Sequence, residues 1–196
     1  GSLVWRALDI SHRTWPGVVV ADIDKDGAQE IVVAQAGGWV TVFRLDKSIK
    51  WQTQIDGGTG ELRGLLAADL DGDNSALEVV VTRAAGSVTN TWVLNANLSV
   101  RSGWPQLLND TNGYSWGVYN ANAAAGNIDG DAQLELVVPS DVHYINAFNP
   151  DGSPVPANST VYPGRSWWGQ VGVWESITTE LRGWGYCNGV RSESYR

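Results

Sequence analysis

An alternating run of carboxylate residues occurs three times in this chain, and each copy leads directly into a run of β-formers. The copies read ADIDKDGAQEIVV at residues 21–33, ADLDGDNSALEVV at 68–80 and GNIDGDAQLELVV at 126–138. Internal repetition on this scale indicates successive copies of one supersecondary unit, none of which can bury its apolar face alone. The chain must therefore fold as an array of similar units.

Each copy has strand-like sequence on both sides. Small or aliphatic residues precede it at 18–20, 65–67 and 123–125, and β-branched residues follow it, which predicts a strand, a loop and a second strand. The three repeats align again at 43–48, 94–99 and 148–153, where a third strand is expected to end in an Asx-type turn. A fourth strand is expected near Trp51 in the first repeat and near Trp104 in the second. The unit is a four-stranded one.

Four-stranded units of about 50 residues are typical of β-propeller blades. Among the 196 residues, 23 are Gly and 7 are Pro, which suits many short strands joined by tight turns. We predict an all-β fold of four-stranded antiparallel blades in a single propeller section, residues 1–196. The expected blades span about 17–60, 64–118 and 122–175, with partial blades at both ends, the last from about 183. Closed propellers typically have about four to eight blades, so we expect a section of a larger ring or a protomer that another chain completes.

Oxygen ligands stand at alternate positions of each loop, followed by a last acid four or five residues later. A cation of calcium size takes about six to eight oxygens, and alternating acids in a tight loop direct several of them to one point. The candidate metal ligands are Asp22, Asp24, Asp26, Ala28 and Glu30 in the first loop, Asp69, Asp71, Asp73 and Glu78 in the second, and Asn127, Asp129, Asp131, Gln133 and Glu135 in the third. Ala28 and Gln133 would contribute backbone carbonyls. In the second loop Leu77 takes the place of the last acid, so that Glu78 needs a one-residue bulge to reach the site.

This repeat resembles the FG-GAP or VCBS-type blade of integrin α-subunit propellers and of many secreted propellers, whose loop reads D-x-D-x-D-G-x-x-D. The first loop matches at every ligand position, with Glu30 for the last Asp, and the third has Asn127 first and its Gly before Asp131 instead of after it. The resemblance covers roughly residues 17–175. It implies up to three structural Ca²⁺ ions and an extracellular or cell-surface protein. The alternative is that the loops are polar turns without an ion.

The formal net charge of -8 argues against a nucleic-acid or anionic-membrane partner, since both require a basic face. No apolar run approaches the roughly 18 to 20 residues of a membrane span, so we expect no membrane insertion. Three sequons, at Asn97, Asn109 and Asn158, can carry glycans in a secreted chain. Of the 11 Trp, the group at Trp167, Trp168, Trp174 and Trp184 either fills the wedge between blades or stacks on sugar rings.

The sequence offers little for catalysis. Its two histidines, His12 and His143, lie in unrelated contexts, and no G-x-S-x-G motif is present. The leading hypothesis is a non-catalytic, calcium-stabilised extracellular propeller for binding, adhesion or assembly, with a protein or carbohydrate ligand. An alternative is part of a secreted carbohydrate-active enzyme such as a polysaccharide lyase. Another is a structural protomer that builds a fibre or ring with copies of itself through open blade edges.

Overall fold

The computed structural model describes residues 1–3, 6, 12–58, 60–84, 89–108, 122–139, 144–156, 171–172, 186–187 and 190–191. These residues form β-strands and one short 3-10 turn, η1 (Ile55–Gly58), and contain no α-helix. The all-β prediction is confirmed. Within this described part of the chain, no helix is long and apolar enough to cross a membrane.

Twelve of the strands form three four-stranded antiparallel sheets, here called the first, second and third blades. The first blade contains β1 (Val19–Ala21), β2 (Glu30–Ala34), β3 (Trp39–Arg44) and β4 (Ile49–Gln54). The second contains β5 (Glu61–Ala68), β6 (Glu78–Ala84), β7 (Thr89–Leu94) and β8 (Gln106–Leu108). The third contains β9 (Ala124–Gly126), β10 (Glu135–Pro139), β11 (Tyr144–Phe148) and β12 (Val171–Gly172). In each blade, the strands pair in chain order, as in an up-and-down meander.

The strand boundaries differ from the sequence prediction by a few residues. The second blade begins at Glu61, because β5 pairs with β6 from Glu61 to Ala68, rather than at residue 64. The fourth strands begin at Ile49 and Gln106, on either side of the predicted Trp51 and Trp104. Two short strands, β13 (Tyr186–Cys187) and β14 (Val190–Arg191), pair with each other in the region where a partial blade was expected.

The predicted Asx turns close the third strand of every blade with the same hydrogen bonds. The backbone N–H of Ser48 donates to Asp46 Oδ1 at 2.9 Å, that of Ser99 to Asn97 Oδ1 at 3.0 Å, and that of Ser153 to Asp151 Oδ1 at 2.9 Å. An Asx side chain bonded two residues ahead reverses the chain locally. The three turns therefore bring the next residues back in the same register, with Phe43 opposite Ile49, Leu94 opposite Val100 and Phe148 opposite Pro154.

The first and second blades pack face to face through a core of β-branched and aliphatic side chains. Val32 and Val42 of the first blade, Val79 and Val81 of the second, and Ile23 of the first loop are each 0% exposed and belong to one cluster. Alternation along the strands sends these residues to one face of each sheet. Trp92 on β7 completes this cluster at 3% exposed.

A second core joins the second blade to the third. Leu70, Val93 and Leu136 are fully buried in it, together with Trp104 and Phe148. Trp104 also donates its indole N–H to the carbonyl of Pro150 across the interface, at 2.9 Å. Trp92 and Trp104 thus fill space between blades, one of the two roles considered for the tryptophans. The group at Trp167, Trp168, Trp174 and Trp184 lies outside the described residues.

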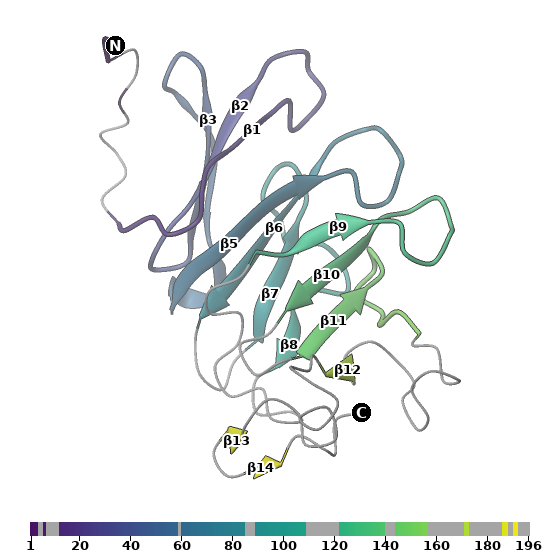
Figure 1. The fold of residues 1–196 in the computed structure, drawn as a ribbon. Coiled ribbons are helices and arrows are strands. Elements are labelled where there is room, and N and C mark those ends of the chain that lie inside the picture. The colour runs from purple at the N-terminus through teal and green to yellow at the C-terminus, as the bar shows by residue number, and fades with distance from the viewer. Residues whose placement is uncertain are drawn as a thin grey trace.

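The three acidic loops follow one another along one side of the blades, at the β1–β2, β5–β6 and β9–β10 connections (Figure 1). Backbone hydrogen bonds link them directly. The N–H of Leu77 donates to the carbonyl of Ile23 at 2.7 Å, and the N–H of Leu134 donates to the carbonyl of Leu70 at 2.8 Å. The second and third loops are therefore each attached to the loop of the preceding blade.

Candidate cation sites

The structure brings carboxylates together in all three loops. The groups are Asp22, Asp24 and Glu30 in the first loop, Asp69, Asp71 and Asp73 in the second, and Asp129, Asp131 and Glu135 in the third. In each group the nearest oxygens of the three side chains lie within 4.8 Å of one another. Oxygens at this separation can share one hard cation.

Hydrogen bonds within the first loop fix its shape. Gly27 has a φ of 93°, in the left-handed region that glycine tolerates, and its N–H donates to Asp22 Oδ2 at 2.9 Å. The N–H of Ala28 donates to Asp26 Oδ1 at 2.8 Å. At the end of the loop, Glu30 is 1% exposed and accepts the N–H of Ile23 at 3.0 Å. The chain thereby turns back so that its acids face one point.

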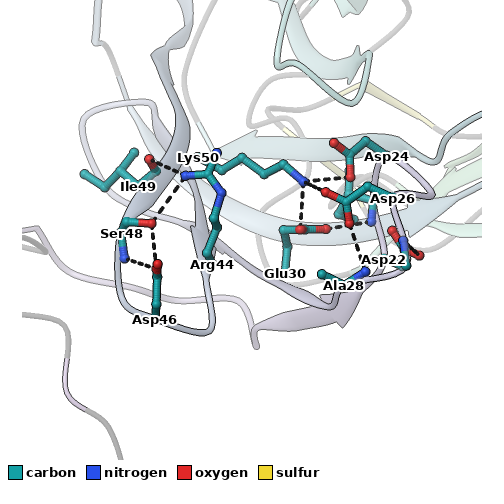
Figure 2. Close-up of polar contacts among 12 residues, drawn as sticks. Asp22, Asp24, Asp26, Ala28, Glu30, Arg44, Asp46, Ser48, Ile49 and Lys50 are labelled. Carbon is teal, nitrogen blue, oxygen red and sulfur yellow. Dashed lines mark hydrogen bonds and ion pairs between the residues drawn. The ribbon is translucent and has the colours of Figure 1, made fainter.

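Lys50, on strand β4 of the same blade, reaches into this first group (Figure 2). Its ammonium lies 2.7 Å from Asp24 Oδ1, 2.8 Å from Asp26 Oδ2 and 2.9 Å from Glu30 Oε1. The Lys50 side chain is only 7% exposed. Burial acts to lower the pKa of Lys50, but the hydrogen bonds that its ammonium donates to Asp24, Asp26 and Glu30 outweigh it and raise that pKa above its ordinary value. The ammonium stays charged.

The second loop reproduces this arrangement with different residues. Glu78 accepts the N–H of Leu70 at 2.8 Å, as Glu30 accepts that of Ile23, although Glu78 stands one place later in its loop. Arg101 occupies the position in the second loop that Lys50 occupies in the first. Its guanidinium lies 2.5 Å from Asp71 Oδ2 and 2.7 Å from Glu78 Oε1. Desolvation raises the pKa of Glu78, while the hydrogen bond from Leu70 and the charge of Arg101 oppose that rise.

The third loop keeps the hydrogen bond between its last acid and the start of the loop. Its first residue, however, accepts from an N–H three places later, whereas Asp22 and Asp69 accept from N–H groups five places later. The N–H of Ile128 donates to Glu135 Oε2 at 2.6 Å, and that of Gly130 donates to Asn127 Oδ1 at 2.7 Å. Asn127 Nδ2 also donates to the carbonyl of Asp131, so the Asn127 side-chain amide stabilises the turn. Glu135 is 0% exposed, and its Oε1 has no hydrogen-bond partner among the described residues.

The structure places the predicted ligands differently within each loop. Asp26 stands outside the tightest group of the first loop, with its side chain 48% exposed, and Glu78 stands outside that of the second. The backbone amides of Ala28 and Gln133 donate to Asp26 and Asp131. Sequence reasoning did not identify Lys50 and Arg101. The available signal was a cationic residue two places after the serine of the Asx turn in two repeats of the three.

A cavity of about 390 Å³ opens between the first and second loops. Its lining includes Asp24, Trp51, Asp71, Asn97 and Arg101. It therefore combines charged groups from two blades with one aromatic ring. Asn97, a predicted sequon, is exposed beside it, whereas Asn109 and Asn158 lie outside the described residues.

The two histidines contribute nothing to these sites in the described structure. His12 is exposed, and its backbone carbonyl accepts the side-chain amide of Gln35 at 2.8 Å. His143 lies outside the described residues.

Comparison with protein families agrees with this repeated hairpin geometry. Residues 22–81 match the FG-GAP-like repeat. The matched stretch begins at the first acid of the first loop and ends in β6, so it contains the acidic hairpins of two blades. The predicted resemblance to the FG-GAP-like repeat is confirmed for this stretch. No match was found among curated protein sequences.

Two solved structures similar to the chain are crystal structures of BBS1N in complex with ARL6DN, one soaked with lead and one with mercury. The first shares 18% sequence identity with this chain, with a TM-score of 0.46 over 71% of this chain and 38% of that one. The second shares 16% identity, with a TM-score of 0.48 over 81% of this chain and 46% of that one. This chain thus spans less than half the length of either protein.

Proposed function

We propose that this chain is a non-catalytic, calcium-stabilised propeller section that acts outside the cell in binding, adhesion or assembly. The observation that carries the proposal is the gathering of carboxylates within 4.8 Å in three equivalent loops. Carboxylate oxygens are the ligands that Ca²⁺ prefers, and carboxylates held this close repel one another unless a positive charge lies among them. A structural cation accounts for both features.

A cation bound in a loop would stabilise contacts between blades as well as the hairpin itself. The loop residues Ile23 and Leu70 are fully buried and accept hydrogen bonds from the next blade. Fixing the acids around an ion would therefore hold these acceptors in place. The cavity between the first and second loops, which some of these acids line, is a candidate binding surface. Its Trp51 ring and its charged groups suit a carbohydrate or a protein loop.

Thermal unfolding tests the calcium part of the proposal. At a free Ca²⁺ concentration about 100 times its Kd, binding to the folded state adds about 2.7 kcal/mol, which raises Tm by roughly 5 to 10 °C for a chain of this size. Mg²⁺ at the same concentration is the control, since it demands a tighter octahedral site. A Tm that is the same with chelator and with calcium would contradict the proposal.

Assembly with further copies of the chain is a second role, favoured by apolar side chains on the first blade. Val18 and Val20, at the start of the first blade, are 59% and 57% exposed. Exposed apolar surface of this kind marks interaction sites in soluble proteins. Sedimentation velocity at increasing concentration should show oligomers, and a Val18→Thr, Val20→Thr double variant should shift them toward monomer. A wild-type monomer at every concentration would exclude this role.

A further inference from the structure

Positive side chains already lie among the acids of two of the three loops. We propose that Lys50 and Arg101 act as built-in cations of the first and second loops, so that an added divalent cation binds only in the third. The third-loop part of this inference rests on the calcium function proposed above. The built-in cations are inferred independently, from the geometry of the loops.

The position of Lys50 is that of a shared cation rather than of a surface ion pair. Its ammonium contacts one oxygen from each of three carboxylates, at 2.7 to 2.9 Å. One of these, Glu30, is fully buried, and the Lys50 stem is buried beside it. Figure 2 shows the ammonium pointing into the loop between Asp24, Asp26 and Glu30. A Ca²⁺ ion in this loop would have to displace it.

Arg101 holds the second loop in a similar way. Its two terminal nitrogens contact different acids, Asp71 and Glu78, at 2.5 and 2.7 Å, so the guanidinium bridges the start and the end of the loop. A planar guanidinium with several donors suits such a bridge. Glu78 therefore has a partner on each oxygen, since its Oε2 accepts the N–H of Leu70.

The third blade has an apolar residue where the other two have a cation. Lys50, Arg101 and Val155 each stand two residues after the serine that closes the Asx turn. The backbones of the second and third blades also correspond at this position. The N–H of Arg101 donates to the carbonyl of Val93, and the N–H of Val155 donates to the carbonyl of Ala147, both at 2.9 Å. Val155 is 2% exposed. The third loop thus has no cationic side chain at this position.

Glu135 shows the effect of this difference. Its Oε2 accepts the N–H of Ile128, but its Oε1 has no partner in the described part of the chain, whereas the Oε1 atoms of Glu30 and Glu78 bind Lys50 and Arg101. Glu135 is 0% exposed, and an isolated buried carboxylate oxygen is costly. Its ligand oxygen lies within 4.8 Å of those of Asp129 and Asp131. These three oxygens form a site that is open to a divalent cation.

One buried oxygen in each of the other loops, Asp22 Oδ1 and Asp69 Oδ1, also lacks a hydrogen-bond partner among the described residues. In both residues the second oxygen accepts a backbone N–H, from Gly27 at 2.9 Å and from Asn74 at 3.0 Å. Most of the remaining acids of those loops are already bound to Lys50 or Arg101, and Asp73 accepts the N–H of Ser75 at 2.7 Å. A divalent cation there would have to break these ion pairs first.

Isothermal titration with Ca²⁺ on the calcium-stripped chain tests the inference. We expect one ion per chain. Glu135→Gln should abolish binding, whereas Glu30→Gln, the equivalent change in the first loop, should leave the stoichiometry at one. Two or three ions in the wild type would overturn the inference and leave the calcium function standing. No binding at all would overturn the calcium function and, with it, the third-loop part of the inference.

A variant that adds a cation beside the third loop gives a second test. It leaves the acids of all three loops unchanged. Val155→Lys places an ammonium where Lys50 lies in the first blade, so this variant should bind no Ca²⁺ and should melt at the same temperature with and without chelator. Val155→Leu is the matched control and should still bind one ion. Calcium binding by the lysine variant equal to that of the control would contradict the inference.

Discussion

The ring of Trp104 meets that of Phe148 edge to face, with centroids 5.5 Å apart and an interplanar angle of 68°. Trp104 comes from the second blade and Phe148 from the third, and the same indole donates to the carbonyl of Pro150. One tryptophan therefore provides both apolar contact and a directed hydrogen bond between two blades. Aromatic pairs in this geometry are worth about 0.5 to 1.5 kcal/mol beyond their buried area.

Truncating this tryptophan should weaken the interface between the second and third blades. Trp104→Ala should lower the free energy of unfolding by about 3 to 5 kcal/mol through the cavity it leaves, and Trp104→Phe by about 1 to 3 kcal/mol through the lost hydrogen bond. Chemical denaturation measures both. Trp15→Phe is the control, because Trp15 is 48% exposed. Equal losses for the Trp104 and Trp15 variants would contradict this role.

A glycine at the outer turn of the second blade should resist substitution. Gly103 has a φ of 86°, and a Cβ added there would overlap the carbonyl of Asp151 in the third blade. Gly57 is the matched control, with a φ of 63° and open space around its Cβ position. Gly57→Ala should cost about 1 to 2 kcal/mol from left-handed backbone alone. Gly103→Ala should cost clearly more, and similar losses in thermal melts would refute the close approach.

Removing the cation of the first loop should destabilise the chain even without calcium. Lys50→Gln leaves buried Glu30 without its charged partner, and breaking a buried ion pair costs about 3 to 5 kcal/mol. Lys47→Asn removes the same charge from an exposed turn, and asparagine tolerates the φ of 78° found there. We expect less than about 0.5 kcal/mol for that control. Denaturant melts in chelator compare the two, and similar losses would contradict the burial of Lys50.

The Asx turns should contribute to acid sensitivity. Hydrogen bonds from the Ser48 hydroxyl and N–H lower the pKa of Asp46 below 3.8, and those from Ser153 do the same for Asp151. A carboxyl with a lowered folded pKa contributes stability above its unfolded pKa of about 3.9, and loses it as pH falls through the folded value. NMR titration should show both midpoints below 3.8, and Ser48→Ala should raise only that of Asp46.

The second blade provides the control for this titration. Asn97 makes the same turn with the Ser99 N–H and hydroxyl, but its amide does not ionise. Asn97→Asp should therefore add a third carboxyl that titrates below its ordinary pKa. Midpoints at or above 3.8 in all these turns would show that the serine hydrogen bonds do not form in solution.

The repeated hairpins and their turns were predictable because they depend on local chemistry. Alternating acids, a turn glycine and a following β-branched run are all contiguous, and the FG-GAP-like pattern depends on nothing else. Glu78 fell one place out of the pattern, yet the structure gives it the same backbone hydrogen bond as Glu30. A one-residue shift is absorbed by the loop as long as the acid can still reach the start of the hairpin.

The cationic partners could not be predicted from the loops themselves. Lys50 lies on β4, 20 residues after Glu30, and Arg101 lies between β7 and β8, 23 residues after Glu78. Only the folded sheet brings these segments beside the loops. From the sequence pattern alone, each of these two cations is indistinguishable from an ordinary solvent-facing charged residue. Their direction depends on the pleat and on the register set by the Asx turn, both of which are properties of the assembled blade.

The hydrogen bonds from Leu77 to Ile23 and from Leu134 to Leu70 give the row of blades a direction. Both of these bonds are donated by the later blade and accepted by the earlier one, so the first and last acidic loops of the row are chemically unlike. At the leading end the donor position is held by exposed Gln29, and at the trailing end the acceptor position is held by Ile128, which is 47% exposed. A further blade that repeats this contact can add at Ile128 only as a donor. The direction of these backbone hydrogen bonds therefore gives the row of blades a polarity, like that of a growing filament.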